Sequence, residues 1–261
     1  MASDSWKIVE CWKNKLQGQV WKVRDASGRT GYFKFARPDQ WFYSGPLVGN
    51  EWLAKRLADE LRLNAAPVEP VHIHFEGADL YGIVSLPAAA SHTCWRALPE
   101  RVRRHAQSRV HRMRRLLGVI AFDAWLTNID RGSGSNIILY KDSGSLYRWY
   151  LIDHAYALYG SPRKWSRFDP MHRHWQQIWQ FCHVPRGFSQ LADRESLLDM
   201  ARRIGDLSPS YLRDAVAAVP DPGYTDRIKR DVYGTLLYRR TRLANMLDRW
   251  LRFDGSKESA V

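Results

Sequence analysis

The order of strand-like and helix-like segments constrains the fold of this chain most strongly. Before about residue 87, short β-branched and aromatic runs dominate, with a single helical pattern among them. After that point the apolar periodicity becomes mostly helical. Strands followed by helices are typical of an α+β fold. The sequence therefore predicts a small, strand-rich N-terminal lobe at residues 1–87 and a larger, mostly helical C-terminal lobe at residues 88–261.

The N-terminal third contains turn residues at the boundaries that separate the expected strands. Within it, Asn50 is a plausible N-cap for a helix whose apolar stripe includes Leu53, Leu57 and Leu61. Pro87 ends the last expected strand. The expected elements, in chain order, are strands at 6–12, 19–25 and 30–36, a loop at 38–49, a helix at 50–63, and strands at 67–75 and 80–86.

The next segment carries both a helical apolar pattern and many arginines. From Val102 to Ala124, apolar residues recur at three- and four-residue steps, which predicts one long helix after Pro99. Seven arginines between Arg101 and Arg115 occupy its other faces. We expect these arginines to form a solvated face that steers acidic partners. Strands at 137–140 and 148–153 and helices at 190–204, 209–219 and 226–251 are expected to follow.

The composition indicates what the protein would attract. The net charge is +13, and 30 of the 40 basic residues are arginine. Such a surplus attracts nucleic acids, nucleotides, acidic proteins or anionic lipid surfaces. Sequence-specific nucleic-acid binding is not expected, because Trp52, Trp125 and Trp250 fall on apolar helix faces and are expected in the core rather than stacked on bases.

The sequence also bears on the compartment. No apolar run approaches the length of a membrane-spanning helix, which is roughly 18 residues or more. The first residues lack the apolar region of a secretory signal. The three cysteines, Cys11, Cys94 and Cys182, are far apart and without metal-binding spacing, as expected of free thiols in a reducing environment. We therefore expect a cytoplasmic protein without membrane association.

Two nearby segments, WLTNIDRGSGSNIILY at 125–140 and WYLIDH at 149–154, contain the candidate site. Asp130, Asn136 and Asp153 adjoin short apolar runs, and a hairpin would return Asp153 to the same end as the loop. Each residue taken singly is more often a turn or cap residue. Carboxylate and amide oxygens suit Mg²⁺, and phosphoryl transfer also needs a carboxylate near the attacking hydroxyl. Together the three residues predict a site for magnesium and phosphate.

Phosphoryl transfer also needs a positively charged side chain on the phosphates, and Lys34 in the strand GYFKFAR is the candidate. Such a lysine either extends outward from an edge strand or points into a cleft, and propensity alone favours the edge. Glu51 opens the following helix, where a carboxylate interacts favourably with the helix dipole. In a kinase, a glutamate on this helix pairs with the strand lysine.

These segments resemble a known family. FDAWLTNIDRGSGSN and YLIDHAYAL are similar to the N-x-D-R…N and I-D-H motifs of HipA-like kinases, and NEWLAKRLADELRLNAAPVEP resembles the helix after the lysine strand. The similarity runs in order over about residues 8–160. It implies a bilobal, protein-kinase-like fold with ATP and Mg²⁺ between the lobes. The implied roles are Asp130 as catalytic base, Asn136 and Asp153 as metal ligands, Lys34 on the phosphates with Glu51 as its partner, and Ser85, Leu86 and Pro87 as the adenine-side hinge.

The resemblance has three departures. Asn136 lies six residues after Asp130, where such kinases usually have five, and Gly132 and Gly134 could absorb the extra residue. His-Ala follows Asp153 instead of the Phe-Gly of ordinary protein kinases, which agrees with the HipA-like pattern. No G-x-G-x-x-G is present, so Gly18 in NKLQGQ is the candidate for a phosphate-covering loop.

The resulting expectation is an ATP- and Mg²⁺-dependent kinase that phosphorylates Ser or Thr on a protein with an acidic surface. HipA-like kinases are often toxins or effectors, so the resemblance also implies an antitoxin-like partner. Two alternatives remain open: a catalytically inactive kinase fold with a basic partner-binding surface, and a small-molecule or lipid kinase. A metal cluster of His172, His174, Cys182 and His183 is not favoured, because its spacing matches no familiar zinc motif.

Overall fold

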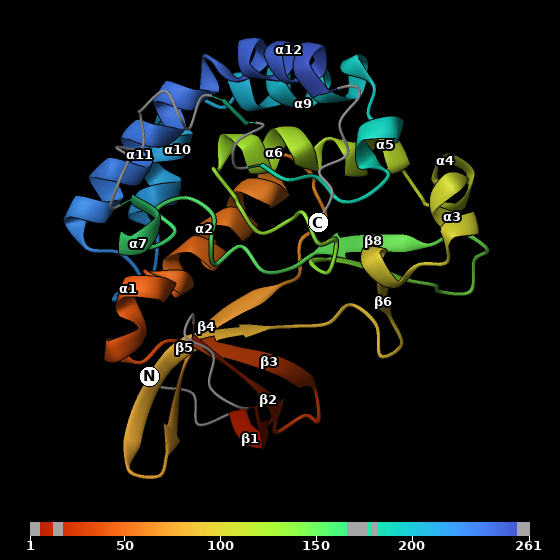
Figure 1. Ribbon diagram of the computed structural model, residues 1–261. Coiled ribbons are helices and arrows are strands. Elements are labelled where there is room, and N and C mark those ends of the chain that lie inside the picture. The colour runs from red at the N-terminus through yellow and green to blue at the C-terminus, as the bar shows by residue number, and fades with distance from the viewer. Residues whose placement is uncertain (1–5, 13–17, 166–176, 179–181, 255–261) are drawn as a thin grey trace.

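A computed structural model describes residues 6–12, 18–165, 177–178 and 182–254 (Figure 1). The N-terminal part is a five-stranded antiparallel sheet with strand order β1-β2-β3-β5-β4. All five predicted strands are present, as β1 (Trp6–Cys11), β2 (Gln19–Asp25), β3 (Thr30–Phe35), β4 (Val68–Phe75) and β5 (Ala78–Ser85). The α+β architecture is therefore confirmed, whereas the lobe boundary at residue 87 stays a prediction.

The two faces of this sheet have different chemistry because side chains alternate along each strand. One face carries a buried aromatic cluster that includes Trp21, Phe33 and Phe35. On the other face, Lys34 of β3 is paired with Val20 of β2 and Ile83 of β5. Since β3 lies in the middle of the sheet, the edge-strand interpretation of Lys34 is wrong.

The helix α2 (Leu47–Glu60) packs on the Lys34 face and begins three residues earlier than predicted. The short helices η1 (Pro38–Gln40) and α1 (Trp41–Ser44) occupy part of the expected loop. Asn50 is therefore not the N-cap, a position that Pro46 holds.

Asn50 instead joins three parts of the fold from inside α2, where it is fully buried. Its Nδ2 donates to the Ala155 carbonyl at 2.8 Å, and its Oδ1 accepts from the Tyr224 hydroxyl at 2.7 Å. A Cβ on Gly49 would lie 2.4 Å from the Tyr224 ring, so only glycine allows this close approach. A polar residue in a helix interior is thus explained by its tertiary partners.

Removing the Tyr224 hydroxyl should destabilise the protein. In Tyr224→Phe, the buried Asn50 Oδ1 loses its donor, and we expect the free energy of unfolding to fall by about 1–3 kcal/mol. Urea denaturation measures this change. Tyr233→Phe is the matched control, because among the described residues the Tyr233 hydroxyl makes one hydrogen bond, an exposed 3.4 Å contact to the Pro209 carbonyl. Equal losses in the two variants would contradict the role assigned to Asn50.

The long helix predicted after Pro99 is wrong as a single element. The segment forms α3 (Glu100–Arg104), α4 (Ala106–Arg109), α5 (Met113–Leu117) and α6 (Val119–Trp125). Tyr147 interrupts it, because its N–H donates to the Arg109 carbonyl and its carbonyl accepts from the His111 N–H. Arg112 then adopts a left-handed conformation with φ of 52°. The apolar periodicity still identified the buried side correctly, as at Met113, Leu117 and Ile120.

The rest of the C-terminal part is a small sheet and several helices. The sheet has the order β6-β7-β8, from β6 (Thr93–Cys94), β7 (Ile137–Tyr140) and β8 (Arg148–Leu151), and the 3-10 helix η2 (Trp95–Ala97) follows β6. The helices are α7 (Pro162–Trp165), α8 (Phe188–Leu191), α9 (Arg194–Gly205), α10 (Pro209–Ala217), α11 (Asp226–Arg240) and α12 (Leu243–Asp254). The helix predicted at 190–204 is divided into α8 and α9, and Asp193 caps α9. The helix predicted at 226–251 is divided into α11 and α12.

The large core of the C-terminal part contains Trp125 and Trp250, and the half-buried Trp52 packs against it, as the sequence predicted. The end of α2 also belongs to this core. Just after α2, the backbone of Asn64 and Ala66 bonds to Leu151 of β8. These contacts fix the N-terminal sheet relative to the C-terminal part. No helix in the described part of the chain has the length and apolar character needed to cross a bilayer.

Candidate active site

The structure brings Lys34, Glu51 and Asp153 together from β3, α2 and the end of β8. Lys34 Nζ lies 2.6 Å from Glu51 Oε1 and 3.2 Å from Asp153 Oδ1. The backbone N–H of His154 donates to Glu51 Oε2 at 2.9 Å, so both carboxylate oxygens of Glu51 are bonded. This arrangement fixes the lysine ammonium beside Asp153.

The electrostatics follow from this geometry. Burial acts to lower the pKa of Lys34, but the charges of Asp153 and Glu51 outweigh it and raise the pKa above its ordinary value. Burial acts to raise the pKa of Glu51, but the charge of Lys34 and the contact with His154 hold it well below the ordinary value. Both groups therefore stay charged at neutral pH.

This ion pair predicts a pH dependence of stability. A carboxyl whose pKa is lower in the folded state stabilises the fold at neutral pH, and the contribution is lost as the pH falls through the folded-state pKa. We expect Glu51→Gln to be less stable than the wild type at pH 7. The difference should shrink as the pH falls below about 4.5, the ordinary value for glutamate. Urea denaturation at several pH values measures it, and a difference independent of pH would contradict the pairing.

Asp130 and Asn136 also meet, despite the extra residue between them. Asn136 Nδ2 donates to Asp130 Oδ2 at 3.0 Å and to the Asp130 carbonyl at 2.8 Å. Gly134 has φ of +71°, and a Cβ at Gly132 would lie 2.6 Å from His183 Cβ. The glycines therefore give the longer loop the turn and the close approach that it needs. Burial and the charge of Asp153 raise the pKa of Asp130, although the Asn136 hydrogen bond opposes them.

Arg131 holds this loop and was not among the predicted site residues. Its guanidinium forms a bidentate pair with Asp123 at 2.9 and 3.3 Å, and both side chains are almost completely buried. Arg131 Nη1 also donates to the carbonyls of Asn136 at 2.7 Å and Ile152 at 3.0 Å. One side chain thus ties the Asp130 loop to the segment before Asp153. The signal in the sequence was its place directly after Asp130, as the arginine of the N-x-D-R…N motif.

Asp153 lies just past β8 in a left-handed conformation with φ of 60°. Non-glycine residues adopt this region sparingly, and such strain is concentrated at functional sites. The carboxylate is one-third exposed and contacts Lys34 through Oδ1. The His154 N–H bond to Glu51 follows directly in the chain and supports this conformation. Asp153 also lines a cavity beside Lys34.

The cavity beside Lys34 has a volume of about 230 Å³ and is lined from both parts of the fold. The predicted hinge residues Ser85, Leu86 and Pro87 line it together with Lys34 and Asp153. Sequence analysis missed its other walls, which are Trp12, Val20, Tyr32, His92, Ile138, Tyr150 and Ile152. Most of these are apolar or aromatic, as in small-molecule binding sites generally.

The one remaining predicted site residue is Gly18. Gly18 has φ of +120° and a Cβ there would lie 3.0 Å from the Phe35 carbonyl, but Gly18 does not line the cavity. Residues 14–17 of the predicted phosphate-covering loop, NKLQGQ at 14–19, lie outside the described residues. Its role therefore stays a prediction.

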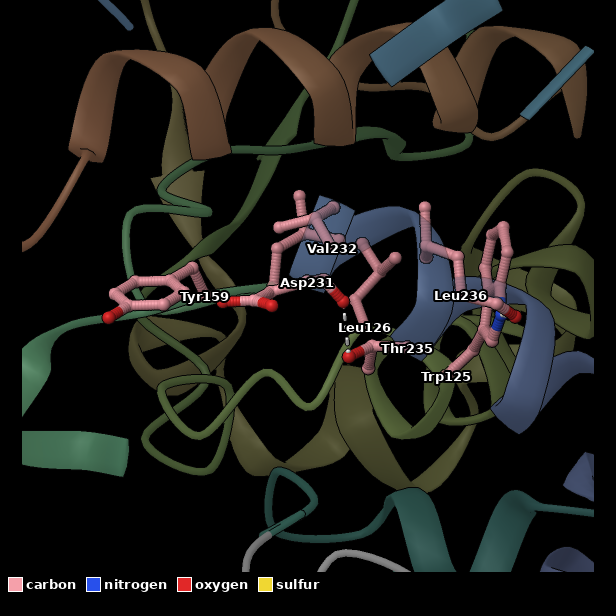
Figure 2. Close-up of a pocket in the computed structure, with 8 residues that line it drawn as sticks. Trp125, Leu126, Tyr159, Asp231, Val232, Thr235 and Leu236 are labelled. Carbon is pink, nitrogen blue, oxygen red and sulfur yellow. Dashed lines mark hydrogen bonds between the residues drawn. The ribbon is translucent and has the colours of Figure 1, made fainter. Parts of the chain in front are cut away.

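A second cavity is unsuited to a ligand. It lies between the end of α6 and α11, where Trp125, Val232 and Leu236 enclose about 10 Å³ (Figure 2). That volume holds about one water molecule. The Thr235 hydroxyl donates to the Asp231 carbonyl at 2.8 Å, so this polar group is already satisfied.

The structure adds no evidence for a metal site at His172, His174, Cys182 and His183, which the sequence did not favour. His172 and His174 lie outside the described residues, and burial raises the pKa of the Cys182 thiol. In the described ranges, no group of three or more His, Cys, Asp or Glu side chains is arranged to hold a metal.

An antiparallel sheet with one long helix, followed by a mostly helical part, defines a protein-kinase-like α+β fold. Over 97% of this chain and 98% of the other, the structure aligns with the proinflammatory kinase CtkA of Helicobacter pylori, at a TM-score of 0.63 and 10% identity. HipA of Shewanella oneidensis, in its complex with HipB and operator DNA, aligns over 95% and 64% of the two chains (TM-score 0.46, 16% identity). Rio2 kinase of Chaetomium thermophilum, with ADP, Mg²⁺ and phosphoaspartate, aligns over 90% and 72% (TM-score 0.47, 14% identity). No protein-family profile and no curated protein sequence matches the chain.

Proposed function

We propose that the protein is an ATP- and Mg²⁺-dependent phosphotransferase of the HipA-like type that acts on Ser or Thr of a protein. The observation that carries this proposal is the position of Lys34, held between Glu51 and Asp153 on the wall of the cavity. A buried lysine with two carboxylate partners matches the phosphate-contacting lysine that kinases require.

The cavity lining, together with Asp130 and Arg131, which do not line the cavity, supports a division of roles. The apolar walls with Ser85 and Leu86 would take the adenine ring, and Lys34 would contact the phosphates. Asp130 would orient the attacking hydroxyl and accept its proton, since its raised pKa leaves it a better base than an ordinary aspartate. Arg131 would keep the loop of Asp130 in register with Asp153 through its two carbonyl contacts.

Asp153 and Asn136 are the residues that would hold Mg²⁺. The side-chain nitrogen of Asn136, Nδ2, is bonded to Asp130. The side-chain oxygen Oδ1 is therefore the Asn136 atom suited to a cation. Asp153 contributes a partly exposed carboxylate. When bound, the ion would neutralise the negative charge of the phosphates. An antitoxin-like partner rests on the sequence resemblance alone and stays a prediction.

Nucleotide binding gives the first test. A ligand that binds only the folded state raises stability by about 2.7 kcal/mol at 100 times its Kd. We therefore expect ATP with Mg²⁺ to raise the melting temperature of the wild type by several degrees, and ATP with EDTA to do so much less. Asp153→Asn should lose most of the magnesium-dependent increase. The absence of any shift in the wild type under both conditions would contradict the nucleotide site.

A further inference from the structure

A basic groove lies on the surface of the C-terminal part, between α5 and α9. Its volume is about 650 Å³, and its walls include Arg114, Arg115, Arg202 and Arg203 together with the less polar Gly118 and Leu198. In Figure 1, α5 and α9 lie at the end of the molecule opposite the N-terminal sheet. The groove is thus separate from the cavity beside Lys34.

The arginines of the groove differ in whether carboxylates already neutralise them. Arg114 pairs with Glu195, and Arg202 pairs with Asp199. Arg115 and Arg203 have no ion pair with any residue in the described part of the chain. The groove therefore contains both satisfied and unsatisfied positive charges.

The unsatisfied charges are concentrated around Arg115. Its guanidinium donates to the Arg62 carbonyl at 3.3 Å. Burial lowers the pKa of Arg115, and the positive charges of Arg203, Arg112 and Arg62 lower it further, with Asp199 opposing them only in part. We call Arg62, Arg112, Arg115 and Arg203 the arginine cluster, in which Arg115 and Arg203 line the groove and Arg62 and Arg112 lie near Arg115 at its margin. An anion bound here would relieve the mutual repulsion of its members.

The lining of the groove favours a peptide over a nucleic acid. Glu195 and Asp199 lie among the arginines of the groove, and a backbone with a phosphate at every nucleotide cannot avoid them, whereas a peptide can space its carboxylates to meet the arginines alone. No aromatic side chain is among its described walls, so bases have no platform on which to stack. The half-buried Leu198 offers apolar contact, whereas Met200 is part of the core beneath the groove. Arginine forks bind carboxylates in a bidentate manner.

We propose that this groove binds an acidic, partly apolar segment of a partner protein, with the carboxylates of the segment on the arginine cluster. The arginine cluster is spatially separate from the proposed catalytic site, because none of its residues lines the cavity beside Lys34. The sequence predicted that all seven arginines of Arg101–Arg115 would attract acidic partners. The proposed binding surface keeps only Arg112 and Arg115 of these and adds Arg62 and Arg203.

Fluorescence anisotropy with a labelled peptide of Glu and Leu residues tests the proposal. We expect the double variant Arg115→Glu/Arg203→Glu to weaken binding at least about tenfold. The matched control is Arg101→Glu/Arg109→Glu, which changes the net charge equally at two exposed arginines of α3 and α4 that have no ion pair in the described residues. The control should weaken binding less than about twofold. A Lys and Leu peptide should not bind.

A second variant keeps the test decisive if replacing the half-buried Arg115 impairs folding. Arg62 and Arg112 are exposed, so Arg62→Glu/Arg112→Glu should keep the melting temperature of the wild type and still weaken peptide binding several-fold. Equal losses in the cluster variants and the control would overturn the proposal, since net charge alone would then explain binding. Tighter binding of a duplex DNA fragment than of the peptide, or no binding of the peptide, would overturn it as well.

Discussion

Asp130→Asn is expected to lower phosphoryl transfer about 10²- to 10⁴-fold, the range typical of a lost general base. The substitution keeps the size of the side chain and an oxygen that can accept the Asn136 hydrogen bond, and removes only the charge. ATP binding should therefore change little. Calorimetric titration with ATP and Mg²⁺ measures the binding, and a coupled assay of ADP formation measures the turnover.

The two proposed metal ligands provide the comparison for this variant. Asp153→Asn should weaken magnesium-dependent binding as well as transfer, because a hard cation prefers an anionic oxygen. Asn136→Ala should have an intermediate effect if Asn136 ligates the metal despite the longer loop. Equal turnover by the wild type and Asp130→Asn would exclude Asp130 as the base.

Asp123→Asn is expected to be the most destabilising substitution near the site. Asp123 and Arg131 are only 1% and 2% exposed, so the variant leaves a buried guanidinium without its counter-charge. Breaking such a pair costs about 3–5 kcal/mol of unfolding free energy. Transfer should fall too, because Arg131 also positions the carbonyls of Asn136 and Ile152. Urea denaturation and the turnover assay measure the two effects.

Asp142→Asn is the control for this prediction. Asp142 pairs with Arg148 on the surface, and both side chains are substantially exposed. Such pairs contribute about 0–1 kcal/mol. A loss of similar size in the two variants would contradict the assigned importance of the buried pair.

The sequence predicted those features that depend on local pattern. Alternation and turn residues located all five strands of the N-terminal sheet. The motifs around Asp130 and Asp153 identified residues that the fold does bring into two neighbouring pairs, Lys34 with Asp153 and Asp130 with Asn136. Their catalytic roles stay predictions.

The features that could not be predicted depend on distant partners. Propensity gave Asn50 a capping role, whereas Ala155 and Tyr224, more than 100 residues away, place it inside the helix. Periodicity extended one helix through Val110, whereas pairing with Tyr147 breaks it there. Arg131 appears in the sequence only as a charged neighbour of Asp130, and its buried contacts to Asp123 and Ile152 exist only once the chain folds.

The most direct measurement is transfer of the labelled γ-phosphate of ATP to protein Ser or Thr residues, with wild type and Asp130→Asn compared in the same cell extract. The proposed function predicts magnesium-dependent label on discrete proteins with the wild type, and little or none with the variant. Label in neither sample, with peptide binding intact, would favour the inactive interaction protein. Label confined to a small molecule or lipid would contradict a protein substrate.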